Sequence, residues 1–260
     1  MKELDVLPKE VYHERAGAQM ERHLAVPTWT IQQKMALACR ILAAEGHESG
    51  LDGQISARAS KPGTYYMLQF GLGFDEATAS SIVTVDDDLN VLAGDGMVNP
   101  SNRFHLWLYR TRPGVNAIIH THPPHVSALS MIGQPLVAAH MDTSPFYNDC
   151  AYLSYWPGVP IGDEEGKLIS EAIGDKRTIL LAHHGQLSTG ANIEEAAFLA
   201  FFIERTARLQ LLASSAGTIR PVGEQEIKEA HDYRLRAKTV GATFAYLSRR
   251  ILRTQPETLE

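Results

Sequence analysis

Apolar positions along this chain follow two different spacings. From residue 30 they recur every three or four positions, which predicts a helix that Thr28 or Thr30 could cap and Gly46 would end. The same spacing predicts further helices at 102–111, 126–131, 193–213 and 223–250. Alternating or β-branched runs predict strands at 54–58, 65–70, 81–85, 91–92, 115–119 and 178–182. Because several strands come before the second helix, the pattern favours a mixed, partly antiparallel sheet flanked by helices.

Composition excludes several classes of protein. The 260 residues include 30 acidic and 24 basic side chains, a formal net charge of −6, so neither nucleic acid nor a membrane is expected as partner. No apolar run is long enough to span a bilayer, and residues 1–15 lack the apolar stretch of a secretory signal. The two cysteines form no disulfide framework. We expect a soluble, cytoplasmic protein.

The histidines carry the first indication of chemistry. His120 and His122 flank Thr121 at the end of an apolar strand, and alternate residues of a strand face the same side. A second apolar strand ends at His183–His184–Gly185. Three imidazoles from two strand ends would form a metal site with open positions for substrate or water. A chance pair in a chain with 11 histidines is the alternative for the first motif alone.

Four motifs resemble the class II aldolase/adducin superfamily, in the order and spacing typical of that family. They cover the N-terminal glycine-rich strand, the helix before the metal strand, the metal strand itself and the third-ligand turn: 53–58, 103–113, 116–123 and 180–190. The likeness extends over about residues 30–215. We therefore expect an N-terminal extension (1–29), a family domain (30–215) and a C-terminal helical extension (216–260).

The resemblance implies a fold, an assembly and a cofactor. The fold would be α/β, in three α/β/α layers around a central mixed, largely antiparallel sheet. The assembly would be a homotetramer with active sites between subunits. The cofactor would be a divalent metal, most often zinc, with iron(II), manganese or cobalt as alternatives. The resemblance assigns His120, His122 and His184 as its ligands.

Two features depart from the family pattern. Sugar-phosphate aldolases of the family move protons with a glutamate four residues before the helix histidine, here His105, and that position holds Ser101. A serine without an activating partner is a poor acid or base. At the family's phosphate positions this chain has Phe70–Gly71 and Asn99–Pro100, whose ring and proline add no donors for phosphate. A phosphorylated sugar is therefore not the expected substrate.

Other side chains are candidates for the missing roles. Glu48 and His105 are candidate catalytic residues, although a solvated loop carboxylate is the simpler interpretation of Glu48. His183 is expected to pack away from the site, on the opposite face of its strand. The candidate substrate-binding residues, of which the last two could instead belong to a polar capping loop or a subunit contact, are Gln54, Gly71, Asn99, His140 and Tyr147.

Three functions compete. The leading prediction is a metal-dependent lyase that cleaves a C–C bond, by aldol cleavage or decarboxylation, in a non-phosphorylated hydroxy-carbonyl compound or carboxylic acid. The second is a non-haem iron oxygenase acting on an aromatic keto acid, since three histidines can also hold Fe(II). The third is a non-catalytic, adducin-like binding protein. The presence of all three histidines favours an enzyme.

Overall fold

The computed structural model describes residues 6–260. Eight strands form one sheet in the order β4-β3-β2-β1-β5-β8-β7-β6, in which only the β6–β7 pair is parallel. Their bounds are β1 (Gln54–Arg58), β2 (Thr64–Leu68), β3 (Ile82–Asp86), β4 (Val91–Ala93), β5 (Ala117–Thr121), β6 (Cys150–Leu153), β7 (Thr178–Leu181) and β8 (Gln186–Gly190). The predicted mixed, largely antiparallel sheet is confirmed.

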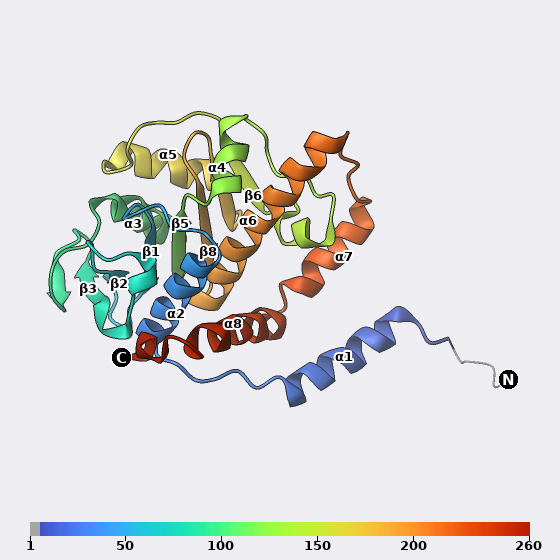
Figure 1. Ribbon diagram of the computed structural model, residues 1–260, viewed down its shortest axis with the longest axis horizontal. Helices are drawn as coiled ribbons and strands as arrows, with labels where there is room; N and C mark the ends of the chain where they lie inside the picture. The colour runs from blue at the N-terminus through green and yellow to red at the C-terminus, as the bar shows by residue number, and fades with distance from the viewer. Residues whose placement is uncertain (1–5) are drawn as a thin grey trace.

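Helices cover both faces of this sheet and complete three layers (Figure 1). Eight α-helices and five short 3₁₀ helices lie within residues 6–260. The α-helices are α1 (Lys9–His23), α2 (Ile31–Ala44), α3 (Arg103–Thr111), α4 (Pro124–Met131), α5 (Asp163–Ile173), α6 (Ile193–Ala216), α7 (Glu224–Arg234) and α8 (Ala237–Leu252). The 3₁₀ helices are η1 (Phe74–Glu76), η2 (Ala79–Ser81), η3 (Pro100–Asn102), η4 (Met141–Phe146) and η5 (Pro256–Leu259). None of these helices has the length and hydropathy that a membrane span requires.

The apolar core is divided between the two faces. One cluster joins α2, α6 and α8 to the sheet, and a second joins α3 and α5 to its other face. The predicted first helix begins one residue after Thr30, whose side chain and that of Gln33 form a reciprocal capping box. This cap fixes the point at which the chain enters the domain.

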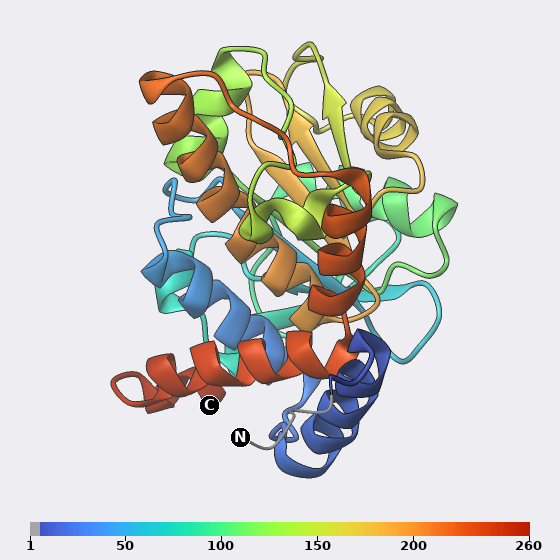
Figure 2. The same ribbon diagram turned by 90° about the vertical axis from the view of Figure 1, so that its right-hand side faces the viewer.

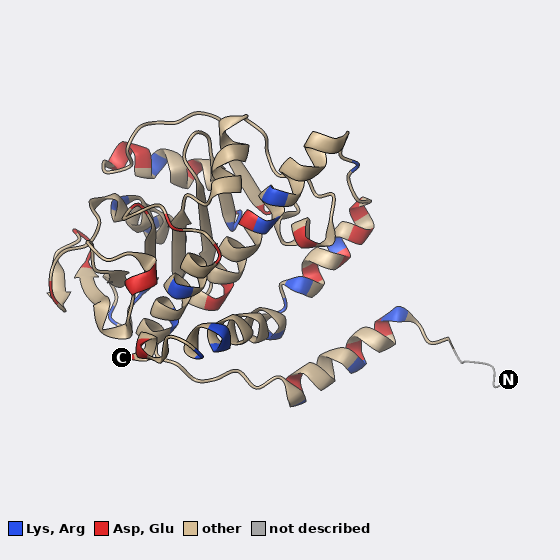
Figure 3. Ribbon diagram, in the orientation of Figure 1, with Lys and Arg blue, Asp and Glu red and all other residues tan. Residues whose placement is uncertain are grey.

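The two ends of the chain differ from the sequence prediction. The N-terminal extension, for which no helix was predicted, contains helix α1, which buries no residue and lies beside α8 (Figure 2). Lys9 pairs with Glu229 of α7, and Lys238 of α8 approaches Glu21 at 3.2 Å. Charged side chains thus dock this largely polar helix, which is why the spacing of apolar residues did not predict it. Both signs of charge alternate along α1 and α7, so neither carries a basic stripe (Figure 3).

The predicted last helix over 223–250 is two helices, with a break at Leu235–Arg236. The second of them, α8, contributes Phe244, Leu247 and Ile251 to the main core cluster. The C-terminal segment is therefore packed into the same core as the sheet. The domain boundaries at residues 29 and 215 remain predictions.

Candidate metal centre and pocket

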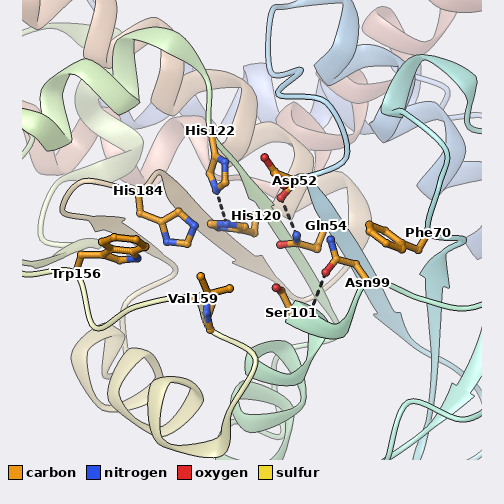
Figure 4. Close-up of a pocket in the computed structure, with 11 residues that line it drawn as sticks. Asp52, Gln54, Phe70, Asn99, Ser101, His120, His122, Trp156, Val159 and His184 are labelled. Carbon is orange, nitrogen blue, oxygen red and sulfur yellow. Dashed lines mark hydrogen bonds between the residues drawn. The ribbon is translucent and has the colours of Figure 1, made fainter.

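Three histidines meet where the interior strand β5 ends beside the turn between β7 and β8. His120 is the penultimate residue of β5, His122 follows that strand, and His184 lies in the turn between β7 and β8. Because β8 pairs with β5 and places Gln186 opposite Thr121, the turn that carries His184 lies beside the end of β5. The ring centroids are 4.5 to 4.7 Å apart, and Nε2 of His120 and His122 approach to 2.8 Å (Figure 4). We call these residues the histidine triad.

The turn that carries His184 depends on its neighbours. A Cβ atom at Gly185 would lie 2.4 Å from the carbonyl oxygen of Thr121 and 2.6 Å from Cδ2 of His122. Only glycine therefore lets this turn approach the end of β5. His183 adopts a positive φ of 57° and is exposed, which corrects the expectation that it packs against the protein.

Burial keeps the triad uncharged. The desolvation of His120 lowers its pKa well below the usual value, and nearby imidazoles lower it further. Burial likewise lowers the pKa of His184 to about 4, while for His122 the lowering of the pKa by burial is partly opposed by the charge of Asp52. Neutral imidazoles offer free lone pairs, which a metal ion requires.

Hydrogen bonds also orient the triad. Nδ1 of His120 lies 2.8 Å from the carbonyl oxygen of Gln186, so this nitrogen donates and Nε2 keeps its lone pair. Nδ1 of His122 lies 3.4 Å from Oγ of Ser49. The three candidate donor atoms all lie within 4.8 Å of one another. This donor set fits a divalent ion such as zinc, with coordination positions left open on the pocket side.

A pocket of about 280 Å³ opens in front of the triad. Besides the histidines, its lining has two kinds of side chain (Figure 4). The polar wall consists of Asp52, Gln54, Asn99 and Ser101. The apolar wall consists of Trp156, Val159 and Pro160, on the side of His184, whereas Phe70 lies at the other end of the pocket, beside Asn99 (Figure 4). The lining has no lysine or arginine, so phosphate would find no cationic partner from this part of the chain.

Several residues predicted as substrate-binding lie in or beside this pocket. Gln54 and Asn99 line it, as does Ser101 at the position of the family's glutamate. Gly71 follows Phe70 in an exposed turn with a φ of 104°, a conformation that suits glycine, but it does not line the pocket. Gln54 and Asn99 thus remain candidate binding residues.

The other predicted residues lie outside the pocket lining. Glu48 is exposed on the loop between α2 and β1. His140 caps η4 by accepting a hydrogen bond from the backbone N–H of Asp142, and Tyr147 ends the same helix. His105 is fully buried in α3, where its Nδ1 contacts Oγ of Ser56 at 2.8 Å and burial lowers its pKa to about 3. Within this chain, none of the four lines the pocket.

Two parts of the lining were not predicted from the sequence. Asp52 precedes β1 in the turn Gly50–Gly53, where an acidic residue is easily explained by turn formation alone. Trp156, Val159 and Pro160 belong to the loop between β6 and α5, which approaches the triad only through the parallel pairing of β6 with β7. The concentration of exposed aromatic and branched side chains at 155–161 is the signal that could have indicated this wall.

The sequence of the chain matches a family in keeping with this geometry. A sequence model of the class II aldolase and adducin N-terminal domain matches residues 33–211. The chain belongs to the class II aldolase and adducin family. The predicted family is thereby confirmed, and relatives within it include aldolases and decarboxylases.

Three class II aldolase relatives show the range of chemistry. The 3,4-dihydroxyphthalate decarboxylase of Arthrobacter keyseri is 31% identical over 215 residues, covering 77% of this chain and 86% of the relative. The 4-hydroxy-3-prenylphenylpyruvate oxygenase/4-hydroxy-3-prenylbenzoate synthase of Streptomyces roseochromogenus subsp. oscitans is 28% identical over 191 residues, covering 72% and 69%. The solved structure of L-fuculose 1-phosphate aldolase from Glaciozyma antarctica PI12 superposes with a TM-score of 0.81 at 27% identity, covering 91% and 97%.

Proposed function

We propose that this protein is a metal-dependent lyase that breaks a C–C bond in a non-phosphorylated, hydroxylated carboxylic acid or hydroxy-carbonyl compound. Among these, decarboxylation of a hydroxylated aromatic acid is the reaction that the pocket supports best. The observation that carries the proposal is that the pocket in front of the histidine triad combines a polar wall with an apolar wall of Trp156, Val159 and Pro160. An aromatic acid would place its ring on the apolar wall and its hydroxyl groups on the polar one.

The triad would hold the metal through His120, His122 and His184. A bound divalent ion would stabilise the negative charge that develops on a substrate oxygen when the C–C bond breaks. The chain's own side chains contribute orientation and exclusion of water. Trp156 and Val159 shield one side of the pocket, while Gln54 and Asn99 present polar groups on the other.

The relatives support a lyase without deciding its substrate. The 31% identical relative is named for decarboxylation of a dihydroxylated aromatic diacid, which fits a pocket with one polar and one apolar wall. A phosphorylated sugar fits less well, because the pocket lining contributes no cationic side chain. We also propose zinc as the metal, a cytoplasmic location and a homotetramer with sites between subunits, to which His140 and Tyr147 could then contribute.

An oxygenase is the second candidate. The 28% identical relative named as an oxygenase supports it, and three imidazoles can hold Fe(II) as readily as zinc. Its substrate would be an aromatic keto acid, which the apolar wall would also accommodate. A non-catalytic, adducin-like role is less well supported, because all three histidines are present and converge.

Release of carbon dioxide tests the proposed function. Protein loaded with zinc would be incubated with 3,4-dihydroxyphthalate and a panel of hydroxylated benzoic acids, and the products identified by chromatography. We expect carbon dioxide and the ring with one carboxyl group fewer. Oxygen uptake with an aromatic keto acid by iron-loaded protein, and none of this cleavage, would instead favour the oxygenase.

A further inference from the structure

The loop between α2 and β1 is tied to the metal strand. Nδ1 of His47, which is 1% exposed, lies 2.9 Å from Oγ1 of Thr121, the residue between two triad histidines. Two residues further, Oγ of Ser49 lies 3.4 Å from Nδ1 of His122. The first half of this loop is therefore held in a fixed position relative to the histidine triad.

The second half of the loop is held by the polar wall. The side-chain amide of Gln54 donates a hydrogen bond to the carbonyl oxygen of Asp52 at 2.7 Å. The side-chain amide of Asn99 donates to the carbonyl oxygen of Leu51 at 3.2 Å. The peptide groups on both sides of Asp52 are thus anchored by two residues that line the pocket, which holds the backbone of Asp52 at the pocket wall.

Asp52 differs in kind from the other lining residues. Of the eleven residues that line the pocket, only Asp52 has a carboxylate side chain. Its negative charge raises the pKa of His122, against the effect of burial. The position at which the family resemblance predicts a glutamate carries only the hydroxyl of Ser101 here. Beside Asp52, the side-chain amide nitrogen of Gln54 is already engaged by the loop (Figure 4). Asp52 is thus the side chain on this wall best suited to accept a proton.

We propose that Asp52 is the catalytic residue that moves protons in this pocket, acting from the loop before β1 in place of a glutamate on the helix before the metal strand. This inference rests on the proposed lyase function and adds the substrate group that Asp52 recognises, a hydroxyl close to the carbon that loses its carboxylate.

The proposed step balances without an oxidant or a further reactant. Asp52 takes the proton of the substrate hydroxyl. The C–C bond to the carboxylate then breaks, carbon dioxide leaves, and the electron pair of that bond remains on the ring carbon. Asp52 returns its proton to this carbon, and the deprotonated oxygen regains a proton from water. The net change is the replacement of one carboxylate by hydrogen, with the uptake of one proton from solvent.

An Asp52→Asn variant tests the proposal, because the amide keeps the size of the side chain and cannot accept the proton. We expect its turnover of 3,4-dihydroxyphthalate or the best acid of the panel to fall ~10²- to 10⁴-fold, with unchanged metal content. Asp88→Asn makes the same chemical change in the exposed β3–β4 turn and serves as the control. Turnover of Asp52→Asn within threefold of this control would overturn the inference and leave the lyase function in place.

A binding measurement separates the two proposals if turnover is not found. Cobalt-loaded protein would be titrated calorimetrically with 3,4-dihydroxybenzoate in buffers of different ionisation enthalpy, which counts the protons released on binding. We expect Asp52→Asn to release about one proton more than wild type, because wild type keeps it on Asp52. Equal proton counts would overturn the role of Asp52 alone. Failure of every acid of the panel to bind would contradict the proposed substrate class and the inference together.

Discussion

The histidine triad and the pocket walls are built on different principles. The triad lies on strand ends in the middle of the sheet, with His120 1% exposed and oriented by a backbone carbonyl. The pocket lining around it comes from four separate segments, mostly loops, and Trp156 and Val159 remain more than half exposed. The comparison teaches that the strand ends provide a rigid set of candidate metal ligands, whereas the loops form the surface that a substrate would contact.

The largest expected effect concerns the triad. His184→Ala removes one of three imidazole ligands, and we expect it to abolish both stoichiometric metal binding and turnover. Elemental analysis after dialysis measures this. His183→Asn is the matched control, because His183 is exposed and asparagine tolerates its positive φ. Full metal content and activity in His184→Ala would refute the ligand assignment.

Gly185→Ala should be the next most damaging change. The added Cβ would clash with the backbone of Thr121 and with the ring of His122, so the turn must move away from β5. We expect metal affinity to fall by about 10- to 100-fold, as for other changes that misplace ligands. Competition with a metal-binding dye measures the affinity. Gly114→Ala, which has no atom within 4 Å of the new Cβ, should bind metal normally.

Trp156→Ala tests the apolar wall by itself. Loss of the indole removes a contact worth about 1 kcal/mol to an aromatic ring, so KM for an aromatic acid should rise ~3- to 10-fold. For a hydroxy acid without a ring, KM should change little. A steady-state comparison of the two substrates measures the difference. Equal effects on both would mean that the wall does not recognise aromatic rings.

Ser101→Ala should have the smallest effect. Ser101 lines the pocket, but its hydroxyl is a poor acid or base and cannot replace a carboxylate in proton transfer. We therefore expect turnover within about threefold of wild type. The same kinetic assay applies. A loss of ~10³-fold, the scale of a missing proton-transfer group, would instead make Ser101 part of the chemistry.

The sequence predicted strand β1 and the convergence of the three histidines, but it did not predict the pocket walls around them. The strand at Gln54–Arg58 has the predicted bounds, and the two histidine motifs lie where alternation and apolar runs end. Strand β8 was not predicted, because Gln186, Ser188 and Thr189 are polar although fully buried. Their partners are distant in sequence: Gln186 donates to Thr121, and Thr189 to the carbonyl of Arg177.

The walls could not be predicted for a related reason. Asp52 belongs to a glycine-rich turn, and Trp156 to a loop without periodicity, so local pattern assigns them to the surface. Their position in the pocket follows from the order and direction of the strands. These bring the loop before β1 and the loop after β6 to the same end of the sheet. Such convergence is a property of the tertiary fold and leaves no mark on local spacing.

The metal content of the wild-type protein tests the central claim most directly. The protein would be purified without added metal and without chelator, and analysed for all transition metals. We predict close to one redox-inert ion per chain, most simply zinc, retained through dialysis by the histidine triad. Absence of any bound metal, even after reconstitution with zinc, iron(II), manganese and cobalt, would contradict the account.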